Sequence, residues 1–209
     1  INARSYMSNW LGGGSCYEPS IEGKKVPIEL SLAVHSDAGF DSNGGLIGSL
    51  AICTTNFNEG KLNSGISRLI SKDFANRLLN GFDRDLPAIA NRWARRYLWD
   101  RNYSETRNPE VPSAIIETLS HQNFPDMILG QDPNFKFAMA RSLYKTVTRF
   151  INEGHGRPTI IQPLAPHNFK VEFTDNSHIR LAWKATEDNL EPSAHPNAYV
   201  VYTAIGASG

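Results

Sequence analysis

Short apolar runs alternate with stretches of helical periodicity along most of the chain. Residues 28–35, 46–55 and 113–116 are short and rich in apolar and β-branched residues, a pattern that predicts buried strands. Apolar side chains at helical spacing predict helices over residues 66–78 and 139–151. Strands that alternate with amphipathic helices predict an α/β fold in which a layered sheet is flanked by helices.

Turn and cap residues indicate where several elements begin and end. Asp132, which a proline follows, predicts a capped start for the second helix, and the apolar pattern continues to Gly154. Ser64 is the expected cap of the first helix. Residues 1–11 have the apolar spacing of a helix end, and residues 103–108 predict a short strand.

Two of the predicted strands end on residues that are capable of acid–base or metal chemistry. Residues 28–35 end on His35, and the apolar run 113–116 leads directly into Glu117. Ligands collect at the carboxyl edge of open α/β sheets, so a neutral imidazole and a glutamate there are typical of a metal-dependent hydrolase. Each residue also has a structural alternative: a hydrogen-bonded histidine, and a carboxylate that caps a loop or pairs with an arginine.

The segments around these two residues resemble a known family. The segment LSLAVHSDAG (residues 30–39) is similar to the strand-then-histidine motif of the AmiC-like, zinc-dependent N-acetylmuramoyl-L-alanine amidases. The segment VPSAIIETLSHQN (residues 111–123) resembles their later motif, which contains a glutamate and closes on an asparagine. The resemblance implies that His35 is the last of three zinc ligands and that Glu117 is the catalytic acid/base. Asn123 matches the closing asparagine.

The chain also departs from the family pattern. The resemblance covers about residues 1–155, and the family's first two zinc ligands precede the motif of His35, where this chain has no matching loop. The resemblance therefore implies that the chain begins inside the catalytic domain. Leu119 and Ser120 replace the usual Gly-Phe, and His121 is additional. For His121, a hydrogen bond to an oxyanion, a hydrogen bond to the glutamate and an ordinary loop position are all open.

The resemblance carries an expected activity. It implies a peptidoglycan hydrolase that uses Zn²⁺ to cleave the amide between N-acetylmuramic acid and L-alanine in a muropeptide. It also implies a bacterial protein that acts in the periplasm or outside the cell. Because the motifs supply one zinc ligand of three, we expect the chain by itself to be inactive. The alternatives are a non-catalytic cell-wall or glycan-binding protein on the same scaffold, and a zinc peptidase.

Composition narrows the classes of partner. The 209 residues are 40% apolar and 20% charged, as in ordinary globular proteins. The 21 lysines and arginines equal the 21 acidic residues, so no net charge favours nucleic acid, and no apolar run approaches the roughly 18 residues of a membrane span. Residues 92–99 mix aromatic and cationic side chains, which favours either an amphipathic segment or a sugar-facing role for Trp93 or Trp99.

The two cysteines leave two alternatives open. Cys16 lies in a glycine-rich loop, and Cys53 lies in the predicted strand 46–55, which we expect beside strand 28–35. The thiols are either independent or joined in a disulfide, which would require an oxidising compartment.

A change of composition predicts a second domain. Glycine and proline clusters divide the chain into an amidase-like part, a linker and a final part, at residues 1–156, 157–166 and 167–209. In the last part, alternating or apolar runs predict three strands, at residues 169–173, 179–183 and 199–202. With its proline-rich entry, this part resembles the beginning of a fibronectin type III module. The Gly-His-Gly sequence around His155 follows a helix and is not expected to bind metal.

Overall fold

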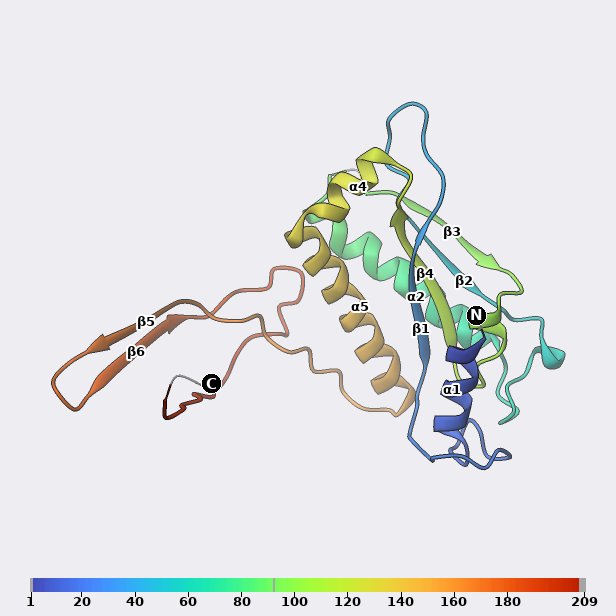
Figure 1. Cartoon of the computed structure of the whole chain (residues 1–209), viewed down its shortest axis with the longest axis horizontal. Coiled ribbons are helices and arrows are strands. Elements are labelled where there is room, and N and C mark those ends of the chain that lie inside the picture. The colour runs from blue at the N-terminus through green and yellow to red at the C-terminus, as the bar shows by residue number, and fades with distance from the viewer. Residues whose placement is uncertain (1, 92, 207–209) are drawn as a thin grey trace. The chain divides into compact units, whose positions relative to one another are not determined.

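The computed structural model describes residues 2–91 and 93–206 (Figure 1). Arg92, at the start of the predicted aromatic and cationic segment, lies outside the described residues. The chain divides into two compact units, Ile1–His155 and Gly156–Gly209. Each unit is treated by itself.

A four-stranded mixed sheet forms the centre of the first unit. Its order is β1-β4-β2-β3, and the strands are β1 (Ser31–Asp37), β2 (Ser49–Cys53), β3 (Arg95–Asp100) and β4 (Ser113–Ser120). Strand β4 runs parallel to β1 and antiparallel to β2, and β2 runs parallel to β3. The first four residues of β4 are fully buried, as expected for a central strand with an apolar β-branched pair. The predicted α/β fold class is confirmed.

The helices complete the first unit. They are α1 (Ala3–Gly12), α2 (Leu69–Asp85), α3 (Ser104–Arg107), α4 (Phe124–Gln131) and α5 (Pro133–Gly154), with 3₁₀ turns η1 (Asn58–Gly60) and η2 (Leu86–Ala88). Helix α2 packs on β2 and β4 through its apolar stripe, and α5 packs on α2 (Figure 1). The predicted start of α5 is confirmed, because the side chain of Asp132 accepts the N–H of Asn134.

The two faces of the sheet differ in what covers them. On the face toward α2, the core contains Ala51, Phe74, Leu78, Ala114 and Ile116, which belong to a larger buried cluster. The opposite face carries a small cluster of Leu50, Ile52 and Ile115, with Ala33 and Trp99 packed against it. These three residues are themselves buried, and we call this side of the sheet, opposite α2, the open face. The short helix α3, on which α1 packs, contacts β4 and β2 at one end of the sheet.

Both candidate residues lie within their strands instead of at the ends. Strand β1 continues two residues past His35, and β4 continues to Ser120. The prediction that His35 and Glu117 end their strands is wrong, because the β1–β4 ladder extends past them to pair Asp37 with Ser120. The expected pairing of strands 28–35 and 46–55 is also wrong. Strand β4 lies between β1 and β2.

Two local predictions fail because nearby backbone groups hydrogen-bond differently. Residues 103–108 contain helix α3 instead of a strand, since the N–H of Arg107 bonds the carbonyl of Tyr103. Ser64 does not cap α2, which begins at Leu69. The N–H of Leu62 bonds the carbonyl of Ile66, so residues 62–66 form a tight turn before the helix.

The second unit contains one β-hairpin. Strands β5 (His167–Phe173) and β6 (Ile179–Lys184) pair antiparallel and agree with two of the three predicted strands. Residues 199–202 have no strand pairing in the described structure, so the third prediction is wrong. Instead the ring of Tyr199 meets Trp183 edge-on, with centroids 5.2 Å apart.

The two cysteines are not joined. Cys16 is exposed, whereas Cys53 is completely buried in β2, and burial raises the pKa of the Cys53 thiol to about 12. The thiolate is the form that reacts with iodoacetamide. In the native chain at pH 8, Cys16 should therefore be alkylated and Cys53 should not. Cys53 should react only after unfolding, and peptide mapping identifies the modified cysteine. Rapid alkylation of Cys53 in the native chain would contradict the buried position.

Candidate functional site

His35 and Glu117 lie side by side on the open face. The parallel register of β1 and β4 pairs the two residues directly, and alternate residues of a strand share one face, so both follow Ala33 and Ile115. The Nδ1 atom of His35 is 3.7 Å from Oε1 of Glu117. This is an ion-pair distance that is longer than a hydrogen bond. The juxtaposition of imidazole and carboxylate therefore follows from strand pairing.

A second carboxylate, which sequence reasoning missed, contacts the same imidazole. Oε2 of Glu105, on α3, lies 3.0 Å from Nε2 of His35, and Oε1 of Glu105 lies 2.9 Å from Nη2 of Arg4 on α1. Both carboxylates are largely buried, with side chains 11% exposed in Glu105 and 13% in Glu117. The strand predicted for residues 103–108 gave Glu105 no place near His35. In the structure this segment contains the helical turn α3, which places the Glu105 carboxylate beside the imidazole.

An aspartate and an arginine border the pair. Asp37, two residues after His35 on β1, forms an ion pair with Nη1 of Arg96 on β3. Nη2 of Arg96 donates a hydrogen bond of 3.2 Å to the hydroxyl of Tyr97. The site thus draws on β1, β3, β4 and α3, which are far apart in sequence.

The environment of Glu117 makes its carboxylate more basic than usual. Burial raises the pKa of the Glu117 carboxyl, and the nearby carboxylates Asp37 and Glu105 raise it further, against the lowering influence of His35 and Arg96. One oxygen, Oε2, is buried and has no hydrogen-bond partner among the described residues. A carboxyl with a raised pKa and an unused oxygen can exchange a proton with a bound molecule.

The described residues do not complete a metal centre. A catalytic zinc takes three protein ligands and leaves a position open. Within residues 2–91 and 93–206, no group of three histidine, cysteine, aspartate or glutamate side chains has the geometry to hold a metal. Both ring nitrogens of His35 also face carboxylates. A metal on His35 would have to replace one of these carboxylate contacts, and the zinc expected from the resemblance does not fit the described residues alone.

His121 lies beyond the end of β4 and is exposed. Its Nδ1 atom is 3.2 Å from the hydroxyl oxygen of Ser36, and its backbone N–H donates to the carbonyl of Asp37. Ser36 alternates with His35 along β1, so the recorded contact of the His121 ring is not with the His35–Glu117 pair. This contact favours the loop role among the alternatives for His121.

Asn123 and Asp126 hold the long loop after β1 against the end of β4. The Asn123 amide donates to the carbonyl of Gly45 at 2.9 Å and to the Asp126 carboxylate at 2.8 Å. Asp126 is fully buried and also accepts the N–H groups of Ile47 and Ser120. The closing asparagine of the motif therefore positions backbone near the site.

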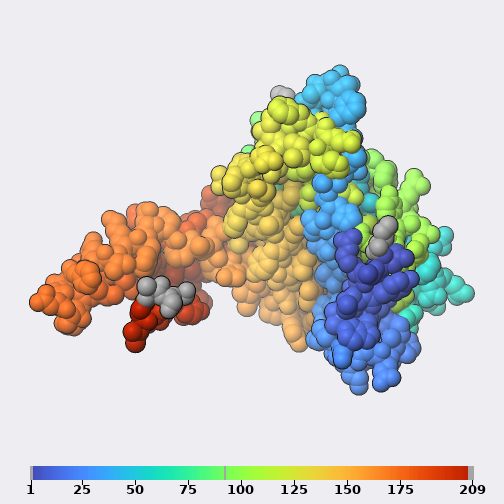
Figure 2. Space-filling model, in the orientation of Figure 1, coloured from blue at the N-terminus to red at the C-terminus, as the bar shows by residue number. Residues whose placement is uncertain are grey.

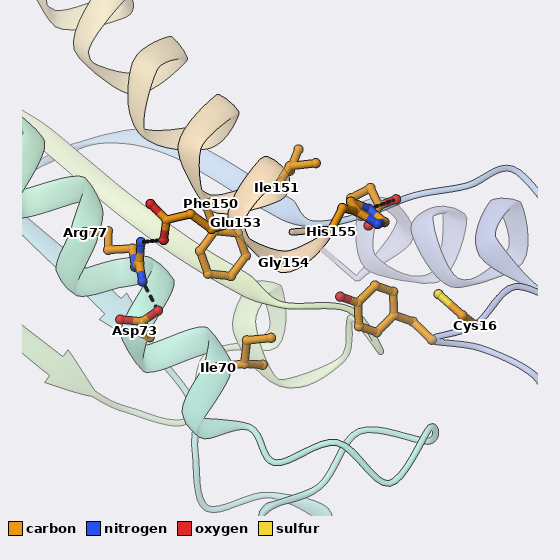
Figure 3. A pocket seen from close by; sticks show the side chains of 11 residues that line it. Cys16, Ile70, Asp73, Arg77, Phe150, Ile151, Glu153, Gly154 and His155 are labelled. Atoms are coloured by element: carbon orange, nitrogen blue, oxygen red, sulfur yellow. Dashed lines mark hydrogen bonds and ion pairs between the residues drawn. The ribbon is translucent and has the colours of Figure 1, made fainter. Parts of the chain in front are cut away.

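A cavity of about 380 Å³ lies elsewhere in the first unit (Figure 3). Arg77 faces it from α2 and pairs with Asp73 and Glu153, while His155 pairs with Glu29. Glu29 precedes the first residue of β1, whereas His35 is near the other end of that strand. The charged side chains of this cavity that Figure 3 shows are paired with one another, so the His35–Glu117 pair remains the candidate site.

Comparison with known proteins finds a similar structure but no similar sequence. No protein-family model matches the sequence, and no curated protein sequence is significantly similar to it. The amidase Ami1 of Mycobacterium smegmatis has a similar structure: the TM-score is 0.52 at 16% identity, over 73% of this chain and 61% of that chain.

Two further structural matches are weaker. The CwlD amidase of Clostridioides difficile, solved with the GerS lipoprotein, gives a TM-score of 0.46 at 14% identity, over 60% of this chain and 55% of that chain. The amidase AmiC2 of Nostoc punctiforme gives 0.44 at 12% identity, over 59% and 58%. The chain spans less than two thirds of each of these proteins. By its likeness to Ami1, the chain has the fold of an N-acetylmuramoyl-L-alanine amidase.

Proposed function

We propose that the protein containing this chain is a peptidoglycan hydrolase that cleaves the amide between N-acetylmuramic acid and L-alanine. The observation that carries the proposal is the in-register His35–Glu117 pair on the open face of an amidase-like sheet. Both residues fall in the two segments that resemble the amidase motifs. The fold alone is compatible with many activities, so the argument depends on the site.

Glu117 is the proton carrier in this proposal. Its free Oε2 accepts a proton from the attacking water and then passes it to the leaving amine of L-alanine. The raised pKa of the Glu117 carboxyl suits the second step, because the group holds the proton after accepting it. The ion pairs of Glu105 with Arg4 and of Asp37 with Arg96 hold the surroundings of the pair in place.

The proposed cofactor is Zn²⁺, with His35 as one ligand. With such an ion in place, His35 would hold a Lewis acid that would polarise the scissile carbonyl and would lower the pKa of water toward about 7. We propose that the remaining ligands belong to residues of the protein that are not in this chain, because the described residues form no three-ligand group.

This assignment predicts a weak metal site in the isolated chain. After dialysis against micromolar zinc and then buffer, the 209-residue chain should retain well below one equivalent of metal by atomic absorption, and it should leave muropeptides intact. One tightly bound equivalent together with amide cleavage would contradict the proposed ligand set.

Product analysis tests the proposed reaction. Purified muropeptides treated with the zinc-loaded complete protein should yield intact stem peptides with a free L-alanine amine, measured by mass spectrometry and amine labelling. Shortened stem peptides would instead identify the alternative zinc peptidase. Stoichiometric glycan binding without any cleavage would identify the non-catalytic alternative, which the lack of a three-ligand group in the described residues favours.

The expected site of action is the cell envelope, in the periplasm or outside the cell, with peptidoglycan as the partner. None of the described helices is long and apolar enough to cross a membrane. We also propose that residues 157–166 are a linker and that residues 167–209 belong to an accessory module of the fibronectin type III kind. The antiparallel β5–β6 hairpin supports this assignment.

A further inference from the structure

The cavity shown in Figure 3 has an apolar wall and a charged rim. Its volume is about 380 Å³, and all the residues that line it belong to the first unit. Ile70, Phe150 and Ile151 supply the apolar part of the wall, and Tyr17 adds a second aromatic ring. Pockets of about 300 Å³ or more, with mostly apolar walls and a few polar groups, are typical of small-molecule sites. The cavity therefore has the size and the wall of a ligand site.

The aromatic segment of β3 offers no comparable space. Trp93 packs with Phe135 in the core, and their ring centroids are 5.1 Å apart. The guanidinium of Arg101 lies over the Trp99 ring, 5.6 Å from its centroid. The sugar-facing role that the sequence leaves open for Trp93 is therefore wrong, and the ring of Trp99 is already in contact with a cation.

The cavity opens where helix α5 ends and strand β1 begins. Nε2 of His155, directly after α5, lies 3.0 Å from Oε1 of Glu29, two residues before β1. In Figure 2 the orange surface at the end of α5 meets the blue surface of the segment that leads into β1. Cys16, which also lines the cavity, is exposed. A small molecule can therefore enter from solvent without a change of fold.

Negative charge is in excess among the residues that line the cavity. Arg77 alone serves two carboxylates: its Nε atom is 2.8 Å from Oδ2 of Asp73, and its Nη1 atom pairs with Glu153 (Figure 3). Glu29 is a third carboxylate, and its imidazole partner carries at most one positive charge. Three carboxylates thus face two basic groups, so the balance is negative in either state of the imidazole.

Two further features favour a positive charge in the cavity. The C-terminal end of α5, a helix of 22 residues, lies at the cavity, and the partial negative charge of a helix C-terminus attracts cations. Burial raises the pKa of the Tyr17 phenol, and the nearby Glu29 carboxylate and Cys16 thiol raise it further. Surroundings that disfavour a phenolate favour a cation, and a carboxylate beside an aromatic ring is a common receptor for ammonium groups.

We propose that this cavity binds a small organic cation, an ammonium group on an apolar body. The apolar body lies against Ile70 and Phe150, and the ammonium group donates to Glu29 beside the Tyr17 ring. Oε1 of Glu29 contacts His155, whereas Oε2 has no hydrogen-bond partner within residues 2–91 and 93–206. The ligand can therefore bind Oε2 without displacing the imidazole.

This site is distinct from the His35–Glu117 pair. Glu29 lies before β1, and the strand from Ser31 to His35 alone spans about 13 Å at about 3.3 Å per residue. The inference therefore does not rest on the proposed hydrolase reaction. Failure of either one leaves the other standing.

Three ligands that share a phenyl group test the preference for positive charge. At pH 7, 2-phenylethylamine is a cation, 2-phenylethanol is neutral and 3-phenylpropanoate is an anion. Titrations of the ¹⁵N-labelled 209-residue chain, followed by backbone amide signals in NMR, give the three dissociation constants. The amine should bind at least about tenfold more tightly than the alcohol, with the largest shifts at Cys16, Tyr17 and His155. The anion should not bind.

Cys16 gives a second readout in the wild-type chain. An amine in the cavity lies against the thiol, so saturating 2-phenylethylamine should slow the alkylation of Cys16 by iodoacetamide several-fold. Glutathione in the same mixture corrects for reagent that the amine consumes. The alcohol at equal concentration should leave the rate nearly unchanged.

Glu29→Gln tests the proposed contact. It keeps the size of the side chain and removes the charge, so it should weaken binding of the amine about tenfold and leave the melting temperature close to wild type. Glu59→Gln is the matched control, because Glu59 is an exposed glutamate on η1 that does not line the cavity. It should leave the affinity unchanged.

The ligand series needs no variant, so it is decisive even if Glu29→Gln unfolds. Equal affinity for the amine and the alcohol, or no binding by any of the three ligands, would overturn the proposal. Full affinity in a folded Glu29→Gln chain, or unchanged alkylation of Cys16 in the presence of the amine, would overturn it as well.

Discussion

Replacing Glu117 by glutamine in the complete protein is expected to lower the rate of muropeptide cleavage by about two to four orders of magnitude. Glutamine fills nearly the same volume in the largely buried position but cannot accept the proton of the attacking water. The loss should fall on kcat, with KM, bound metal and melting temperature close to wild type. Initial rates on a purified muropeptide measure the effect.

His121→Gln is the matched control for this substitution. His121 is exposed and hydrogen-bonds Ser36 instead of Glu117, so its removal should change kcat by less than about threefold. If Glu117→Gln retained activity within tenfold of wild type, Glu117 would lose its assigned role. A large loss in His121→Gln would instead transfer part of the proton chemistry to the histidine.

Removing one partner of the Asp85–Lys145 pair is expected to destabilise the first unit by about 3–5 kcal/mol. Nζ of Lys145 on α5 lies 3.0 Å from Oδ2 of Asp85 at the end of α2, and both side chains are 2% exposed. Arg84 donates a second ion-pair hydrogen bond to Asp85. Lys145→Met leaves a buried carboxylate without its buried partner, and urea denaturation followed by circular dichroism measures the loss.

The double variant Asp85→Asn/Lys145→Met should cost less than the sum of the single variants, because neither buried charge is left alone. Arg77→Gln is the control. It removes two ion pairs, with Asp73 and Glu153, in which every side chain is more than a third exposed, and it should cost less than about 1 kcal/mol. Additive losses in the double variant would contradict a coupled buried pair.

The same pair sets a dependence on pH. Burial disfavours the charged form of Asp85, but hydrogen bonds from Arg84, Lys145 and Ser142 outweigh it and lower the pKa of the Asp85 carboxyl in the folded state. Its stabilising contribution is therefore complete above the unfolded pKa of about 3.9 and is lost as the pH falls through the folded value. Asp85→Asn should lack this acid-dependent loss.

Local sequence patterns predicted the elements whose formation depends mainly on the residues within them. The apolar pair Ile115–Ile116 indicated the buried strand β4, and the Asp132 cap fixed the start of α5. Strand order and strand length depend instead on pairing between distant segments. Nothing in residues 28–35 indicates that β4, about 80 residues later, separates β1 from β2.

The candidate site divides in the same way. His35 and Glu117 stood out because each follows an apolar run. Glu105 lies on α3, a single helical turn that is too short to show helical periodicity. Asp37 and Arg96 meet across the sheet order and could not be paired from sequence. Residues such as Glu105 and Arg96, which reach the site from other elements, can be recognised only from the tertiary structure.

The most direct test of the central claim is the zinc content of two variants of the complete protein, measured by atomic absorption after dialysis. Each residue has one assigned role: His35 holds the metal, and Glu117 carries the proton without being a permanent ligand. His35→Ala should therefore lose zinc, while Glu117→Gln should retain one equivalent and lack activity. Full zinc in His35→Ala, or loss of zinc in a folded Glu117→Gln protein, would contradict this assignment.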